Sequence, residues 1–79
     1  MNKTENPIAS IIIPVFNEKD YIERCIESVI SSTEGIENME LLLIDGGSTD
    51  GTQEIIKKFV DRHEFIKYLR TKRKLFQPH

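Results

Sequence analysis

Cysteine, long apolar runs and net charge are all scarce in this sequence, and each scarcity excludes a class of protein. Cys25 is the single cysteine among 79 residues, so an intrachain disulfide and a cysteine-based metal cluster are both excluded. No apolar stretch approaches the ~20 residues that span a bilayer. The polar residues 1–6 do not form a signal peptide. We therefore expect a cytoplasmic chain, with peripheral association at the inner face of the membrane left open.

The charge balance argues against a nucleic-acid partner. The formal net charge is −2, too close to zero for a general polyanion binder. We interpret the basic cluster near the end of the chain as a solvated stretch rather than a phosphate site; it contains Lys67, Arg70, Lys72, Arg73 and Lys74. His63 and His79 have no partners at metal-ligand spacing, so the sequence predicts no metal site.

Two apolar segments have the pattern of strands buried on both faces, because polar residues do not alternate with apolar ones in them. The first covers residues 10–15 and is expected to end at Pro14, since proline cannot donate a ladder hydrogen bond. The second covers residues 39–44, where the glycines that follow favour a strand over a helix. Residues 65–69 are predicted to form a third strand, and residues 71–79 a basic tail.

Apolar residues recur with a helical period after each of the first two strands. Asn17 is predicted to cap the first helix, with Glu18 and Asp20 in its first turn. The buried stripe of this helix is expected to contain Ile22, Cys25, Ile26, Val29 and Ile30. We interpret Cys25 as a small buried hydrophobe. Asp50 and Gln53 form a predicted capping pair for the second helix. The stripe of that helix contains Ile55, Ile56, Phe59 and Val60.

The order β-α-β-α-β predicts an α/β fold with a parallel, Rossmann-like sheet. Crossovers between parallel strands are right-handed, so both helices are expected on one face of the sheet. The other face has no helix in this sequence to cover it, although leaving one large Leu or Ile exposed forfeits roughly 1.5–3 kcal/mol. We expect further polypeptide or a partner chain, including a second copy of this one, to complete a three-layer architecture.

Candidate ligand-binding residues follow the first two strands, where open α/β sheets bind their ligands. Pro14, Phe16, Asn17 and Glu18 stand at the end of the first strand, where an aromatic ring can stack on a flat base. The alternative is that Phe16 packs as a hydrophobic staple and Asn17 only caps a helix.

A second candidate segment, residues 45–51, follows the second strand. It contributes Asp45, Gly46, Gly47 and Ser48. The glycines allow a close backbone approach to a ligand, and amides at the start of the next helix attract phosphate. Asp45 could accept a hydrogen bond from a base or a ribose hydroxyl. The alternative is a tight strand-to-helix turn without a ligand.

Both segments match a known pattern. Residues 10–18 (SIIIPVFNE), the helix beginning YIERCIESV at residue 21, and residues 43–52 (LIDGGSTDGT) together resemble the opening of family 2 inverting glycosyltransferases, which have the GT-A fold. The Asp-Gly-Gly form resembles the branch that assembles bacterial exopolysaccharides. The resemblance divides the chain into an N-terminal tail (1–7), the N-terminal part of a glycosyltransferase domain (8–70) and the basic tail (71–79).

The resemblance implies a nucleotide-diphosphate-sugar donor and a glycan or lipid-linked acceptor. Pro14 and Phe16 would line the base pocket beside Glu18, with Phe16 in place of the family's usual tyrosine. Asp45 would touch the nucleoside, and Gly47 and Ser48 would shape the loop. Gly46 stands where the family commonly has a second Asp that contacts uracil, so a uridine donor is less secure.

The family's metal-binding Asp-x-Asp motif and its catalytic base are expected downstream, and this sequence contains neither. The full-length family is expected to use Mg²⁺ or Mn²⁺, with ligands outside this chain. We therefore interpret the chain as the donor-binding segment of a longer transferase, inactive alone. The alternatives are a free-standing nucleotide-binding or regulatory module that works through a partner chain, and a structural remnant without a ligand.

Overall fold

A computed structural model describes residues 9–71 of the protein. The elements are β1 (Ala9–Val15), α1 (Ile22–Ser32), β2 (Met39–Asp45), α2 (Thr52–Arg62) and β3 (Ile66–Arg70). The β-α-β-α-β order predicted from the sequence is confirmed. Each strand begins and ends within one residue of its predicted boundary, so the apolar runs located the strands well.

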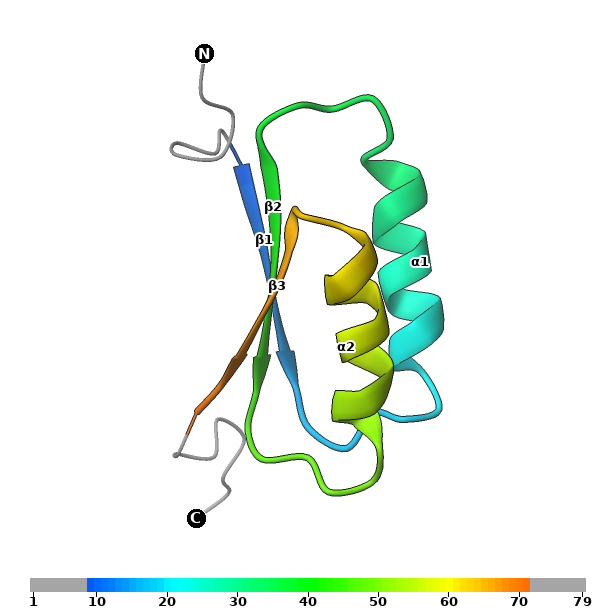
Figure 1. Cartoon of the computed structure of the whole chain (residues 1–79), viewed down its shortest axis with the longest axis vertical. Coiled ribbons are helices and arrows are strands. Elements are labelled where there is room, and N and C mark those ends of the chain that lie inside the picture. Colours follow the sequence, from blue (N-terminus) through cyan, green and yellow to red (C-terminus); the bar gives the residue numbers. More distant parts are fainter. Residues whose placement is uncertain (1–8, 72–79) are drawn as a thin grey trace.

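The three strands form one parallel sheet in the order β1-β2-β3. Both helices cover the same face of this sheet, as right-handed crossovers with strands added in one direction require (Figure 1). The described residues thus form two layers, one of strands and one of helices. None of the described helices has the length and apolar character to span a bilayer.

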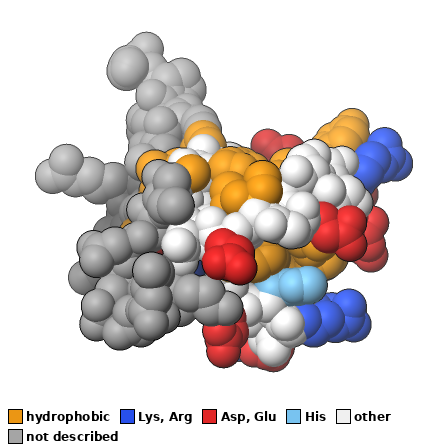
Figure 2. All heavy atoms as spheres, turned by 90° about the horizontal axis from the view of Figure 1, so that it is seen from above, with side chains coloured by type: hydrophobic (Ala, Val, Ile, Leu, Met, Phe, Trp, Pro, Cys, Tyr) orange, Lys and Arg blue, Asp and Glu red, His pale blue; other side chains and the backbone are white. Residues whose placement is uncertain are grey.

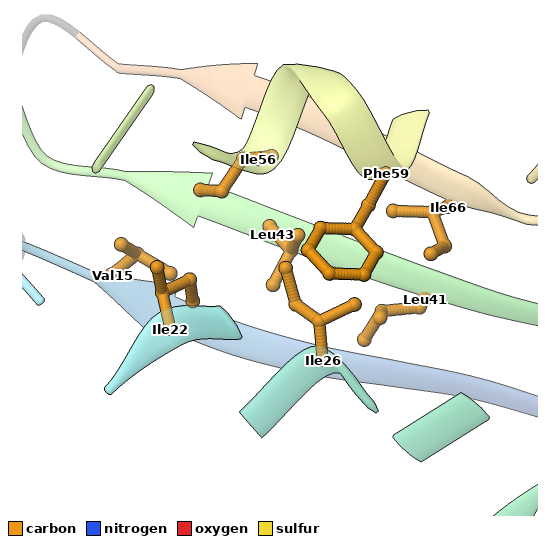
Figure 3. Close-up of a cluster of buried hydrophobic side chains, with 8 residues drawn as sticks. All are labelled: Val15, Ile22, Ile26, Leu41, Leu43, Ile56, Phe59 and Ile66. Carbon is orange, nitrogen blue, oxygen red and sulfur yellow. The ribbon is translucent and has the colours of Figure 1, made fainter. Parts of the chain in front are cut away.

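The hydrophobic core lies between the helices and the sheet. Side chains from all five elements point toward one another there (Figure 3). Its buried members are Val15, Ile22, Ile26, Leu41, Leu43, Ile56, Phe59 and Ile66. Alternate residues of each strand supply this face, while the i, i+4 spacing of Ile22 and Ile26 supplies the facing stripe of α1. Charged side chains gather on the outer side of the helices (Figure 2).

The start of α1 differs from the prediction. The N-cap position is Tyr21 and not Asn17, and Glu18 and Asp20 precede the helix rather than forming its first turn. Asn17 has a left-handed backbone, with φ of 51°, and its side chain binds another loop instead of the helix. Pro14 does not end β1 either, because Val15 still pairs with Asp45.

Two smaller predictions about side chains were also wrong. Asp50 does not pair with Gln53 as a capping box. Its carboxylate instead accepts hydrogen bonds from the amide and hydroxyl of Thr52, and Gly51 occupies the N-cap position of α2 with φ of 103°. Cys25 is only half-buried, because it lies at the edge of the apolar stripe of α1.

The face of the sheet away from the helices is open in the described part of the chain. Ile12 on β1 and Leu69 on β3 are 58% and 52% exposed. Leu42 and Ile44 on β2, which alternate with the buried Leu41 and Leu43, are half-buried. The expectation of an apolar face without a helical cover is therefore confirmed for residues 9–71. We refer to the face carrying Ile12, Pro14, Leu42, Ile44 and Leu69 as the open face.

The contrast between the two faces gives a test of the core. We expect Ile26→Ala to lower the free energy of unfolding by about 2–5 kcal/mol, because it leaves a cavity between helix and sheet. Ile12→Ala on the open face is the matched control, with an expected loss of about 1 kcal/mol or less. Urea unfolding followed by circular dichroism measures both. Equal losses would show that the two faces are equally buried in solution.

Candidate functional site

The carboxyl ends of β1 and β2 lie side by side. Val15, the last residue of β1, is in register with Asp45, the last residue of β2. The amide of Gly46 then donates to the carbonyl of Val15 at 2.9 Å and continues the pairing by one residue. The loops that follow the two strands emerge at the same end of the molecule (Figure 1). The sequence prediction that both candidate segments meet at one rim is thus confirmed.

Two hydrogen bonds in opposite directions join these loops. The amide of Asn17 donates to Oγ of Ser48 at 2.8 Å, and the amide of Thr49 donates to Oδ1 of Asn17 at 2.8 Å. The left-handed backbone of Asn17 lets its amide and its side chain face the same loop. Asn17 is therefore a clamp between the loops and not a helix cap.

A second pair of contacts joins the loops at the start of α2. The amide of Glu18 donates to Oγ1 of Thr52 at 3.0 Å, and the amide of Lys19 donates to Oδ2 of Asp50 at 3.2 Å. Oδ1 of Asp50 accepts the amide of Thr52. The Asp50 carboxylate thus already places a negative charge at the N-terminus of α2, where the sequence suggested that phosphate would bind.

Asp45 is buried at the base of the rim. Its side chain has 0% exposure. Oδ1 accepts the amides of Gly47 and Ser48 at 3.0 and 2.8 Å and the hydroxyl of Ser48 at 2.8 Å. Oδ2 accepts the hydroxyl of Tyr68. Burial acts to raise the pKa of Asp45, but these hydrogen bonds outweigh it and hold the pKa below its usual value.

Tyr68 was missed by the sequence reasoning. It stands in the middle of β3, in register with Leu43, on the face that packs against the helices. The hydroxyl of a tyrosine in a buried strand position usually has a hydrogen-bond partner. This general rule was the one indication in the sequence that Tyr68 takes part in the site. Burial, together with the hydrogen bond to Asp45 and its charge, raises the pKa of Tyr68.

The predicted site residues divide into an exposed and a buried set. Pro14, Asn17 and Glu18 are exposed, while Phe16 and Gly47 are half-buried. The buried members are Asp45, Gly46 and Ser48. The first loop therefore supplies most of the surface that a ligand can reach, and the second loop supports it.

Position 47 requires glycine because of its backbone φ angle and not because a side chain would lack space. Its φ is 109°, which side-chain-bearing residues rarely adopt, while an added Cβ would meet nothing within 4 Å. The turn lets the amides of Gly47 and Ser48 point back at Asp45.

The described residues do not fit a divalent-cation site. Within residues 9–71 no three His, Cys, Asp or Glu side chains are grouped to hold a metal ion. Two carboxylates at the rim, Asp45 and Asp50, already accept several hydrogen bonds from this chain. What the rim offers a ligand is an aromatic ring, a proline and exposed polar groups.

Comparison with known proteins assigns the family. The sequence pattern described as Glycosyl transferase family 2 matches residues 10–77. The chain belongs to this family. Among solved structures, the family 2 chain is similar in fold to a mannosyltransferase, PcManGT from Pyrobaculum calidifontis, solved with GDP-Man and Mn²⁺. The TM-score is 0.76 at 20% sequence identity, over 96% of this chain and 23% of that one.

Two of the relatives are named as sugar transferases. Glycosyltransferase AglE of Haloferax volcanii is 40% identical over 63 residues, which is 80% of this chain and 21% of AglE. A dolichyl N-acetyl-alpha-D-glucosaminyl phosphate 3-beta-D-2,3-diacetamido-2,3-dideoxy-beta-D-glucuronosyltransferase of Methanococcus voltae is 47% identical over 56 residues, or 71% of this chain and 17% of that enzyme. The family 2 chain thus spans about a fifth of the length of these relatives.

The buried hydrogen bond between Tyr68 and Asp45 can be detected by titration. In Tyr21→Phe, Tyr68 is the single remaining tyrosine. We expect its phenol to ionise well above the ordinary pKa of 10.0, as followed by ultraviolet absorbance. Because the folded state holds this proton more tightly, the phenol stabilises the fold below pH 10.0 and loses that contribution as the pH rises further.

The same titration has an internal control. In Tyr68→Phe, the exposed Tyr21 is the remaining tyrosine, and its absorbance curve provides the comparison. Matching titration curves for the two variants would show that the Tyr68 hydroxyl is not bound to Asp45 in solution.

Proposed function

We propose that this chain forms the nucleoside-binding part of an inverting glycosyltransferase. The complete enzyme would transfer a sugar from a nucleotide-diphosphate donor to a glycan or lipid-linked acceptor. The observation that carries the proposal is the rim itself, where two loops from adjacent parallel strands are joined by direct hydrogen bonds. The similarly folded mannosyltransferase was solved with a nucleotide sugar, which supports the donor class.

The proposed roles follow from which groups are exposed. Pro14 and Phe16 flank the base, and the Phe16 ring stacks on it. Asn17 and Glu18 present polar groups at the exposed edge of the rim. The second loop forms the floor of the site, through Asp45, Gly46, Gly47 and Ser48.

Catalysis is assigned to residues outside the described segment. The described residues do not fit the Mg²⁺ or Mn²⁺ expected for the family, and the sequence has no Asp-x-Asp motif. A general base for the acceptor hydroxyl is also not assigned to any residue of this chain. We infer that these residues bind and orient the donor while other parts of a longer enzyme supply the chemistry.

The proposal also covers the class of acceptor, the branch of the family and the cellular location of the reaction. The relative from Methanococcus voltae is named for a dolichyl phosphate-linked acceptor, which supports a lipid-linked acceptor here. The Asp-Gly-Gly sequence at residues 45–47 favours an exopolysaccharide-type branch. Both fit an enzyme that works in the cytoplasm at the inner face of the membrane.

The open face favours a second candidate function. A free-standing module that binds nucleotides and acts through a partner chain, or through a second copy of itself, would bury the exposed Ile12 and Leu69. Sedimentation velocity separates the two candidates. A defined dimer that dissociates in Ile12→Lys favours the module, whereas a concentration-independent monomer favours the donor-binding part of an enzyme.

Stacking on Phe16 predicts a loss of affinity when the ring is removed. Calorimetric titration of the chain with GDP and UDP is expected to show binding, which Phe16→Ala weakens by about five- to 150-fold, the equivalent of about 1–3 kcal/mol for one stacked base. Phe16→Tyr keeps the ring and is expected to bind like the parent. Leu69→Ala, on the open face, is the surface control. Unchanged binding in Phe16→Ala would remove Phe16 from the site.

The proposed division of labour predicts that the chain alone does not transfer sugar. We expect no Mn²⁺-dependent release of GDP from GDP-mannose, or of UDP from UDP-glucose, above the background without protein. A coupled nucleotide-release assay with the purified chain measures this. Turnover that disappears in Phe16→Ala would show that this chain contains its own catalytic groups.

A further inference from the structure

The contacts of Asp45 bear on how the nucleoside site is held. The resemblance to family 2 implied that Asp45 touches the nucleoside directly. In the structure its side chain has 0% exposure, and both carboxylate oxygens accept hydrogen bonds from this chain. Because the Asp45 side chain has no exposed surface, a nucleoside could reach Oδ2 only if the groups that cover it moved. A direct contact therefore requires a rearrangement of the folded chain around Asp45.

The same contacts form a continuous series from β3 to the exposed loop. The hydroxyl of Tyr68 donates to Oδ2 of Asp45, and Oδ1 of Asp45 accepts the hydroxyl of Ser48 at 2.8 Å. Oγ of Ser48 in turn accepts the amide of Asn17 at 2.8 Å. Oδ1 of Asn17 accepts the amide of Thr49 at 2.8 Å. Each member can take only the orientation that its neighbours allow.

We propose that Asp45 is a positioning residue, and that Tyr68 sets nucleotide affinity by fixing the Asp45 carboxylate beneath the two loops. This inference rests on the proposed function of the rim. The site would then recognise its ligand through Phe16 and the exposed loop, and not through the aspartate itself.

Tyr68 is the most important donor in this series because it binds a different oxygen of the Asp45 carboxylate from the other donors. Three donors, all from Gly47 and Ser48, meet Oδ1. In the described contacts Tyr68 is the donor that meets Oδ2, and it comes from a different strand. It therefore opposes rotation of the carboxylate and ties the loop after β2 to β3. Without it, Oδ2 would be buried with no partner, which favours a rearranged loop.

The two roles for Asp45 predict opposite results for Tyr68→Phe. If Asp45 touches the nucleoside, removing the hydroxyl frees Oδ2 as an acceptor, and binding becomes tighter. If Asp45 positions the loops, the same variant weakens binding, by about tenfold for the loss of one hydrogen bond to a charged group. Tyr21→Phe, at an exposed tyrosine, is the matched control and is expected to bind like the parent.

Calorimetric titration of the full chain with GDP and UDP provides the affinities, and circular dichroism verifies that each variant is folded. Weaker binding in Tyr68→Phe supports the proposal. Unchanged or tighter binding overturns it, while binding by the parent chain keeps the proposed function intact. If the parent chain binds neither nucleotide, the proposed function fails, and this inference fails with it.

A spectroscopic measurement tests the series itself, independently of any ligand. In amide nuclear magnetic resonance spectra, Tyr68→Phe is expected to shift the amide signals of Gly47, Ser48 and Asn17. A purely local role for Tyr68 would move only signals of β3 and its direct neighbours. Unmoved Asn17 and Ser48 signals would overturn the proposed series even if the affinity falls. If Tyr68→Phe does not fold, Ser48→Ala interrupts the series nearer the rim and is expected to weaken binding and shift the Asn17 signal.

Discussion

A carboxylate with no exposed surface is costly to bury unless several donors surround it. At Asp45 the donors come from Gly47 and Ser48 immediately after it and from Tyr68 on the next strand. Because one side chain gathers these groups, the turn after β2 has a single favoured shape, and the loop after β1 is built upon it through Ser48. The arrangement of the whole rim therefore depends on this one buried charge.

Local patterns in the sequence were sufficient for the elements and for their order. Apolar runs located the strands, and the helical period found the buried Ile26 and Ile56. What the patterns missed are contacts between distant residues. Asparagine is a common helix-capping residue, yet Asn17 binds Ser48 and Thr49, which lie 31 and 32 positions further along the chain. The hydrogen bonds to those partners stabilise the left-handed backbone at Asn17, and the spacing of neighbouring residues does not predict this conformation.

In the candidate site, too, the position of residues along the strands was predicted but their contacts with distant residues were not. The prediction that Phe16 and Asp45 stand at one rim follows from the geometry of parallel strands, and the register of Val15 with Asp45 confirms it. The burial of each side chain could not be predicted from the sequence, because Asp45 and Glu18 have similar chemistry but Asp45 is buried and Glu18 is exposed. Tyr68 was overlooked for a related reason, since its partner lies 23 positions away on another strand.

The carboxylate of Asp50 has a consequence for how the rim discriminates among ligands. Helix N-termini in nucleotide-binding folds commonly attract phosphate, but here the start of α2 is already neutralised by a side chain of the protein itself. Recognition at this rim would then depend on ring stacking and shape rather than on charge. Added salt would have little effect on such an interaction, and a nucleoside lacking its phosphates would retain much of the affinity. In the proposed enzyme, the diphosphate and sugar of the donor would then be bound by residues outside this rim.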